Sequence, residues 1–130
     1  MVLNGNAAME GRRLMLTRDT SGQKGSAWHD TQTEVSEFNT TFRFQVTSDE
    51  SASDGFTFAF QPKGTGELGG HGGRLGFRGM SKPRVAFFFE FHGSSSFGVY
   101  SNDDVVAVRE PIFEFEDGSL EFTPDALQTI

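Results

Sequence analysis

The stretch of this sequence best suited to chemistry is a run of glycines near its middle. Residues 69–77 read GGHGGRLGF, with four glycines in the first five positions. Glycine has no side chain to bury, so such a run suits a loop whose backbone takes positive φ or lets a ligand approach its N–H groups. An Asp54-Gly55 turn precedes the run, and an apolar strand ending at Glu90 follows it. Together these features predict the rim of a sheet with a concave site above it.

Each of these residues also has a plain structural interpretation. Asp54 can simply close a turn, because Asp-Gly is a favoured turn pair. The glycines can form an ordinary hairpin loop. Glu90 must be paired if it is buried among phenylalanines, and three side chains are candidates for its partner: Arg84, Arg74 and His92. A metal site made from His71 and His92 requires both to lie at one rim, and solvent-facing histidines are commoner.

The sequence does not favour catalysis. It has no cysteine and therefore no thiol nucleophile. A glycoside hydrolase needs two carboxylates roughly 5–10 Å apart, but the neighbours of Glu90 at alternate positions are Phe88 and His92. Glu114 and Glu116 have the required spacing, yet they alternate with phenylalanines as a solvated strand face does. We therefore predict a protein that is not an enzyme and needs no cofactor.

Composition and charge exclude several classes of partner. The chain has 130 residues and a net charge of −7, without a basic run, which argues against nucleic acid and against a membrane surface. Residues 64–69 match GxGxxG, but no helical pattern follows, so a dinucleotide site is not expected.

The N-terminus has no apolar signal-peptide core and no run reaches the length of a membrane span. The compartment stays unknown.

Period-two segments with turn residues between them predict an all-β sandwich in one domain, residues 1–130. Residues 85–91 barely alternate, so we expect a central strand buried on both faces. Residues 42, 44 and 46 should share one face of a longer strand, and Trp28 should anchor a core. The predicted strands are 13–17, 25–29, 36–47, 57–61, 74–78, 85–91, 97–101 and 103–109, with a hairpin of 112–116 and 120–123 around Asp117-Gly118.

The order of these motifs resembles the L-type (legume-type) lectins, the concanavalin-like jelly-roll family. The resemblance rests on collinear pieces over roughly the first hundred residues. They are NGNA (4–7), LMLT (14–17) with GSAW (25–28), FNTTFRF (38–44), DGF (54–56), GGHGGRLGF (69–77), the strand 85–91, and FGVYSN (97–102). The resemblance implies an antiparallel two-sheet jelly-roll sandwich that binds sugar above its curved sheet.

The resemblance also implies roles for individual residues. Asp54 would accept hydrogen bonds from two sugar hydroxyls, and Gly73 would donate its backbone N–H to the same sugar. A carboxylate is a charge-assisted acceptor, and a glycine lets a sugar ring come close. We expect five residues to contact a saccharide: Asp54, Gly72, Gly73, Arg74 and His92.

Two departures from the family pattern shape these expectations. Family members hold calcium and a transition metal after the strand that ends here at Glu90, but His92 stands where an Asp belongs and the connection 93–96 is short. Calcium needs six or more oxygen ligands, so we predict no metal site. Without the metal, an alternative function is a lectin-like scaffold for protein interaction or inhibition that has lost sugar binding.

The second departure is length, because the chain ends soon after the Asp117-Gly118 hairpin, so the sandwich is predicted to be truncated on its C-terminal side. A second copy that covers the open edges, in a homodimer, is the favoured solution.

Three further residues have two interpretations each. Trp28 and Tyr100 can stack on a sugar face, although a core position suits Trp28 better. Asn39-Thr40-Thr41 is a glycosylation sequon, which has meaning only if the chain is secreted by a eukaryote.

Overall fold

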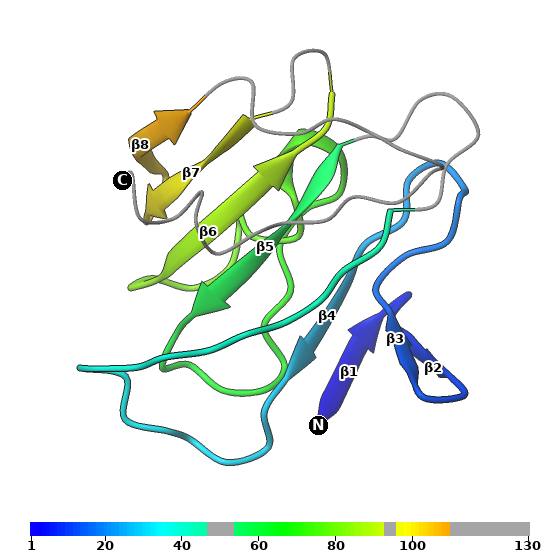
Figure 1. Ribbon diagram of the computed structural model, residues 1–130, viewed down its shortest axis with the longest axis horizontal. Helices are drawn as coiled ribbons and strands as arrows, with labels where there is room; N and C mark the ends of the chain where they lie inside the picture. The colour runs from blue at the N-terminus through cyan, green and yellow to red at the C-terminus, as the bar shows by residue number, and fades with distance from the viewer. Residues whose placement is uncertain (47–53, 93–95, 110–130) are drawn as a thin grey trace.

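The computed structural model describes residues 1–46, 54–92 and 96–109. This part of the chain is all-β, as predicted, with one short 3₁₀ turn. Its elements are β1 (Val2–Gly5), β2 (Ala8–Glu10), β3 (Arg13–Met15), β4 (Gly25–Trp28), β5 (Gly55–Phe60), η1 (Gly72–Arg74), β6 (Val85–Glu90), β7 (Ser96–Ser101) and β8 (Asp104–Arg109). Figure 1 shows their arrangement. None of the described residues forms a helix long and apolar enough to cross a membrane.

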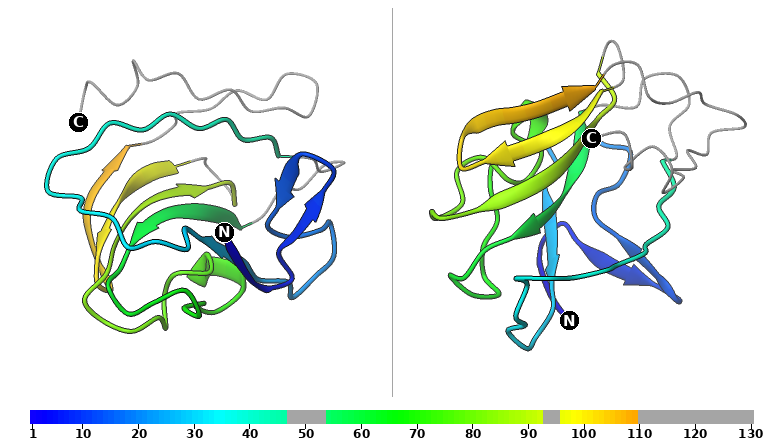
Figure 2. Two further views of the ribbon diagram at one scale, coloured as in Figure 1. Left: turned by 90° about the horizontal axis from the view of Figure 1, so that it is seen from below. Right: turned by 60° about the vertical axis from the view of Figure 1, so that its left-hand side comes forward.

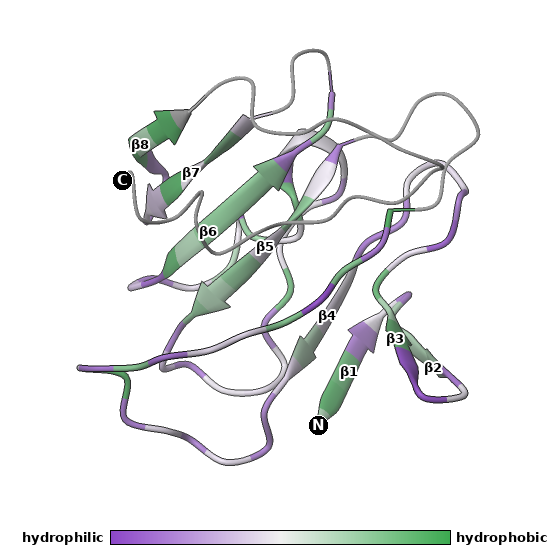
Figure 3. Cartoon of the chain, viewed as in Figure 1, coloured by the Kyte–Doolittle hydropathy of each residue, from purple (hydrophilic) through white to green (hydrophobic). Residues whose placement is uncertain are grey.

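Four antiparallel strands form the main sheet, in the order β5-β6-β7-β8. The inner strand β6 pairs along its whole length with β5 and with β7. Its side chains alternate between two cores, with Ala86 and Phe88 in one and Phe89 in the other. This confirms the prediction of a central strand buried on both faces, and the apolar colouring of β6 in Figure 3 agrees with it.

The two faces of the main sheet are covered by different parts of the chain (Figure 2). On one face lie residues 69–80, which we call the glycine loop, and their apolar side chains build a core with the sheet. On the other face lie residues 36–46, the covering segment, whose phenylalanines meet those of β5 and β6. We call these the loop face and the segment face.

Two small two-stranded sheets, β1-β4 and β2-β3, complete the described strands. The sheet β1-β4 is fastened to the chain leading into the glycine loop, because the hydroxyl of Ser26 and the indole N–H of Trp28 both donate to the carbonyl of Glu67, at 2.8 and 2.7 Å. Trp28 is half-buried and packs against the loop-face core. The prediction of a core position for Trp28 is thus confirmed.

The prediction of a strand at 74–78 is wrong. Leu75 and Phe77 alternate with polar residues, but both side chains are buried from one side of a series of tight turns. The amides of Leu75 and Phe77 donate to the carbonyls of Gly72 and Arg74, at 2.8 and 2.9 Å. Apolar residues at every second position predict a strand only when the pattern is long. Over five residues the same pattern also fits a turn in which each amide donates to the carbonyl three residues earlier.

The prediction of a strand at 36–47 is wrong for the residues that the structure describes. No strand ladder includes residues 36–46. The expected sidedness is nevertheless present, because Phe44 and Val46 pack on the segment-face core and Phe42 stacks on Phe58 with ring centroids 5.2 Å apart. The predicted hairpin at 112–123 lies outside the described residues.

Candidate functional site

Asp54 occupies the turn that leads into β5, and the backbone fixes its position. Its carbonyl accepts a hydrogen bond of 2.7 Å from the amide of Phe91, just beyond the end of β6. The next residue, Gly55, has φ of +148°, and a methyl group there would overlap the carbonyl oxygen of Phe89. Only glycine takes this conformation at so close an approach. Gly55 is therefore required by the pairing of β5 with β6, and the turn holds the Asp54 carboxylate at the edge of the sheet.

The glycine loop brings its backbone up to this carboxylate. Gly72 has φ of +65°, and a methyl group on it would lie 3.5 Å from Oδ2 of Asp54. Its neighbour Gly73 is exposed, and a methyl group there would meet no atom within 4 Å. Among the described residues, no backbone carbonyl accepts from the N–H of Gly73. An acceptor and an open stretch of backbone thus lie side by side.

Internal hydrogen bonds hold the glycine loop in shape. The amides of Gly69 and Gly76 donate to the carbonyls of Gly76 and Gly70, at 2.8 and 2.9 Å, and the amide of Gly70 donates to Arg78 at 2.9 Å. The hydroxyl of Thr57 on β5 reaches the carbonyl of Leu75 at 3.5 Å. These bonds tie the two ends of the loop to each other, and the Thr57 hydroxyl ties its middle to β5.

The loop is also anchored by a stack of rings and cations. Phe77 is 0 % exposed and stacks on Tyr100 with ring centroids 5.6 Å apart. The guanidinium of Arg84 lies 5.2 Å from the Phe77 ring centroid, and that of Arg78 lies 4.9 Å from the Tyr100 ring centroid. Arg84 also donates to the carbonyl of Met80 and to the carboxylate of Asp103. These contacts combine apolar burial with cation–π attraction beneath the site.

The structure corrects the expectation that Tyr100 can stack on a sugar. Its ring is 5 % exposed and lies between Phe77, Phe88 and Arg78. Burial raises the pKa of the phenol, while the charge of Arg78 opposes this rise and the charge of Glu90 adds to it. Tyr100 therefore belongs to the core that supports the site.

Arg84 is not the partner of Glu90. Arg84 is buried and pairs with Asp103, whose pKa is lowered chiefly by a hydrogen bond from Lys82 and further by the charge of Arg84. Glu90 instead accepts a hydrogen bond of 3.3 Å from the hydroxyl of Ser96. A hydroxyl across the β6-β7 pair therefore takes the place of the predicted cation.

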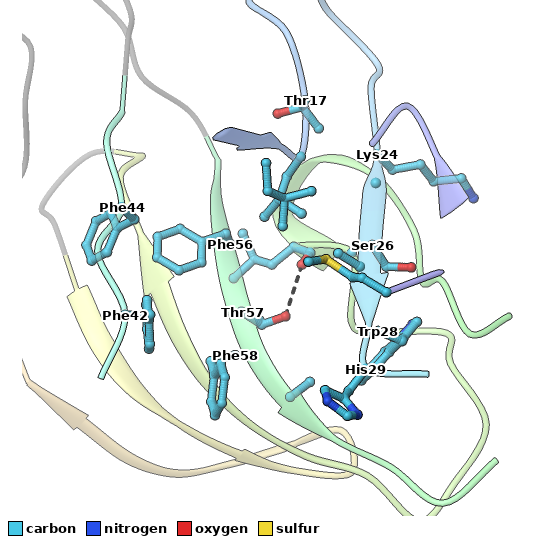
Figure 4. Close-up of a pocket in the computed structure, with 18 of the residues that line it drawn as sticks. Thr17, Lys24, Ser26, Trp28, His29, Phe42, Phe44, Phe56, Thr57 and Phe58 are labelled. Carbon is cyan, nitrogen blue, oxygen red and sulfur yellow. Dashed lines mark hydrogen bonds between the residues drawn. The ribbon is translucent and has the colours of Figure 1, made fainter. Parts of the chain in front are cut away.

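A broad hollow lies between the N-terminal elements on one side and the main sheet with its covering segment on the other (Figure 4). One side presents the rings of Phe42, Phe44, Phe56 and Phe58, and the other presents Ser26 and Trp28 of β4. Asp54, His71 and Gly72 are among the residues that border it. Its aromatic side is the incompletely covered interior of the sandwich, and its polar edge is the candidate site.

The five predicted sugar contacts divide into two groups. Asp54 and Gly72 are neighbours at the edge of the hollow. Gly73, Arg74 and His92 are exposed and do not border it. Arg74 folds its side chain back over Gly70, so that its Cγ would lie 3.3 Å from a methyl group there. His92 follows Phe91, the residue whose amide holds Asp54.

The described residues near Glu90 do not fit a metal site of the kind that the fold implies. No three His, Asp or Glu side chains in the described ranges gather closely enough to hold a metal ion. The Glu90 carboxylate already accepts from Ser96, and His92 is exposed. One carboxylate and one hydroxyl fall short of the oxygen ligands that calcium takes.

The comparison with protein families decides the kind of protein to which this site belongs. Residues 2–81 match the legume-like lectin family, which is more than half of the 130 residues. The chain belongs to this family. Membership confirms the predicted resemblance and the concanavalin-like all-β fold, of which the described residues form a part. Legume-like lectins are non-enzymatic, in agreement with the prediction that this protein is not an enzyme.

Sequence reasoning missed the residues that support the glycine loop. Arg84 precedes the most apolar strand and is 3 % exposed. Its burial was not readable, because Arg is mostly an exposed residue. Its position just before a buried strand is a weak signal, since a charge there must find a partner close by. The hydrogen bonds that hold β4 to the chain before the loop end at the backbone carbonyl of Glu67. A backbone acceptor cannot be recognised from the type of residue that carries it.

Proposed function

We propose that this legume-like lectin binds a saccharide where the glycine loop meets Asp54. The observation that carries the proposal is the nearness of the Asp54 carboxylate to Gly72, where a methyl group would lie 3.5 Å from Oδ2, with Gly73 open beside it. Saccharide hydroxyls both donate and accept hydrogen bonds. A carboxylate accepts hydrogen bonds from two hydroxyls, and a backbone N–H donates a hydrogen bond to a hydroxyl oxygen.

Arg74 and His92 extend this contact surface in the proposal. Both are exposed at the same end of the sheet, and both can donate hydrogen bonds to hydroxyls of a saccharide. The site is shallow, so the affinity of one site is weak. The loop-face core supports the proposal because a loop held in one conformation loses little entropy when it binds.

The experiment is a glycan array with the purified chain, run once with calcium and once with a chelator. Saccharide binding in both runs is the expected result, because the described donor set does not fit calcium. Binding lost with the chelator would overturn the metal-free site. Absence of binding in both runs would favour the second candidate, a lectin-like scaffold that has lost sugar binding, which the poor donor set around Glu90 supports.

Two matched pairs of variants locate the site. Asp54→Ala should abolish glycan binding and leave the fold intact, whereas Asp19→Ala, an exposed carboxylate in another loop, should change nothing. Gly73→Ala should weaken binding by shielding its N–H, whereas Gly66→Ala should not, although a methyl group meets no atom within 4 Å at either position. Unchanged binding in Asp54→Ala would refute the assignment.

We also infer that the protein acts as a homodimer, which would add avidity to a weak site. Support comes from β8, the last strand of the sheet among the described residues, where Val105, Val106 and Val108 are 48, 59 and 52 % exposed. Sedimentation equilibrium should find a dimer for the unchanged chain and a monomer for Val106→Lys. A chain that stays monomeric at all concentrations would contradict the inference.

A further inference from the structure

The covering segment carries a modification motif that plays no part in saccharide binding. Asn39-Thr40-Thr41 matches Asn-X-Ser/Thr, and none of the other three asparagines of the sequence, Asn4, Asn6 and Asn102, starts such a motif. All three residues of the motif are exposed. A sequon can be modified only where its asparagine is on the surface.

The packing of the segment turns the two essential side chains of the motif to one side. Phe38 packs on Phe60 with ring centroids 4.8 Å apart, and Phe42 stacks on Phe58 at 5.2 Å. Side chains alternate along an extended chain, so Asn39 and Thr41 lie opposite to these rings. The acceptor amide and the hydroxyl that a glycosyltransferase requires therefore share the outer side.

Within the described residues, the covering segment is held by its side chains and not by backbone hydrogen bonds. No backbone hydrogen bond between described residues involves residues 37–46. The segment is held to the sheet by aromatic side chains, including Phe44 against Phe56 and Phe89. Drawing the sequon into a transferase then breaks no backbone hydrogen bond between described residues, which lowers the cost of presenting it.

We propose that Asn39 is an acceptor of an N-linked oligosaccharide, donated by a polyprenyl-pyrophosphate-linked sugar. The carboxamide nitrogen of Asn39 forms a bond to C1 of the first sugar, and the bond from C1 to the pyrophosphate oxygen breaks. The pyrophosphate leaves with the electron pair, and the amide proton passes to a carboxylate of the transferase. The glycan adds a bulky polar group on the outer side of the segment and so raises solubility.

The test expresses the full chain behind a cleavable signal sequence in a eukaryotic secretory system. The unchanged chain should gain one glycan, seen as a mass increase that an N-glycan-specific endoglycosidase removes. Asn39→Gln and Thr41→Ala should lose the increase, whereas Thr40→Ala and Thr41→Ser should keep it, since the middle residue is not read and serine retains the hydroxyl. An unmodified chain beside a modified control glycoprotein would overturn the proposal, and so would an increase that survives Asn39→Gln.

A second measurement tests access in the folded protein. Because the chain has no cysteine, a single introduced thiol reports the exposure of its own position. Maleimide should label Asn39→Cys and Thr41→Cys at least about tenfold faster than Ser96→Cys, since reaction at a buried thiol waits for local opening. Ser96 is 3 % exposed. Equal labelling rates at positions 39, 41 and 96 would contradict the exposed sequon.

Discussion

The two faces of the main sheet bury similar kinds of residue by different means. On the loop face, Leu75, Phe77 and Met80 come from a loop tied by its own backbone hydrogen bonds, and each is at most 6 % exposed. On the segment face, Phe38 and Phe42 come from a chain without a described ladder, and both remain more than a third exposed. In this molecule the layer with internal backbone hydrogen bonds covers the sheet more completely.

This difference bears on function because the candidate site sits on the well-closed face. The loop that carries Gly72 and Gly73 also carries Phe77, so the site residues and the buried anchor are joined by a few peptide bonds. The segment face carries the sequon and the exposed rings, and it has no part in the proposed saccharide contacts. Binding requires a fixed geometry, and modification requires an accessible chain.

The variant expected to have the largest effect on stability is Phe77→Ala, on the loop face. This ring is fully buried between Tyr100 and Arg84, so its removal should lower the free energy of unfolding by about 3–5 kcal/mol. Urea denaturation followed by the fluorescence of the single Trp28 would measure the change. A loss below about 1 kcal/mol would mean that the glycine loop contributes little to the core.

The turn that positions Asp54 gives the next largest effect. Gly55→Ala should cost about 1–3 kcal/mol or more, because φ is +148° and the new methyl group overlaps the Phe89 carbonyl. Gly66→Ala is the control, since nothing lies within 4 Å of a methyl group there. Equal stability of the two variants in urea denaturation would show that the Asp54 turn is not fixed as described.

The matched change on the segment face is Phe42→Ala. Phe42 stacks on Phe58 but is 38 % exposed, so we expect a loss of only about 1 kcal/mol in the free energy of unfolding. The same urea denaturation measures it. A cost equal to that of Phe77→Ala would remove the distinction between the faces.

The smallest predicted effect is a shift in the titration of Tyr100, which is seen only at alkaline pH. Burial raises the pKa of Tyr100 above its ordinary value of 10.0, and Glu90 adds to the rise while Arg78 opposes it. The folded state thus favours the neutral phenol, so its contribution is complete below the unfolded pKa and is lost as pH rises through the folded one. The ultraviolet absorbance of this single tyrosine should titrate at higher pH in the folded than in the unfolded chain. Coincident titrations would contradict the burial of Tyr100.

The sequence predicted those elements whose pattern is repeated and local. Residues 85–91 were readable as a buried strand because an unbroken apolar run has few other uses. The proximity of Asp54 to the glycine loop followed from the order of motifs. The state of residues 74–78 was not readable, because Leu75 and Phe77 suit either a strand or a turn. Whether residues 36–46 join a strand ladder depends on which other segments lie beside them, and no local sequence pattern specifies those segments.

The most direct test of the account is amide hydrogen exchange, residue by residue, on the unliganded protein. The amides of Gly69, Gly70, Gly76 and Phe77 are all hydrogen-bonded within the loop, so they should exchange slowly, at rates approaching those of β6. Amides of residues 37–46 should exchange orders of magnitude faster, because no described backbone carbonyl accepts from them. A glycine loop that exchanges as fast as the covering segment would contradict a preformed site on the loop face.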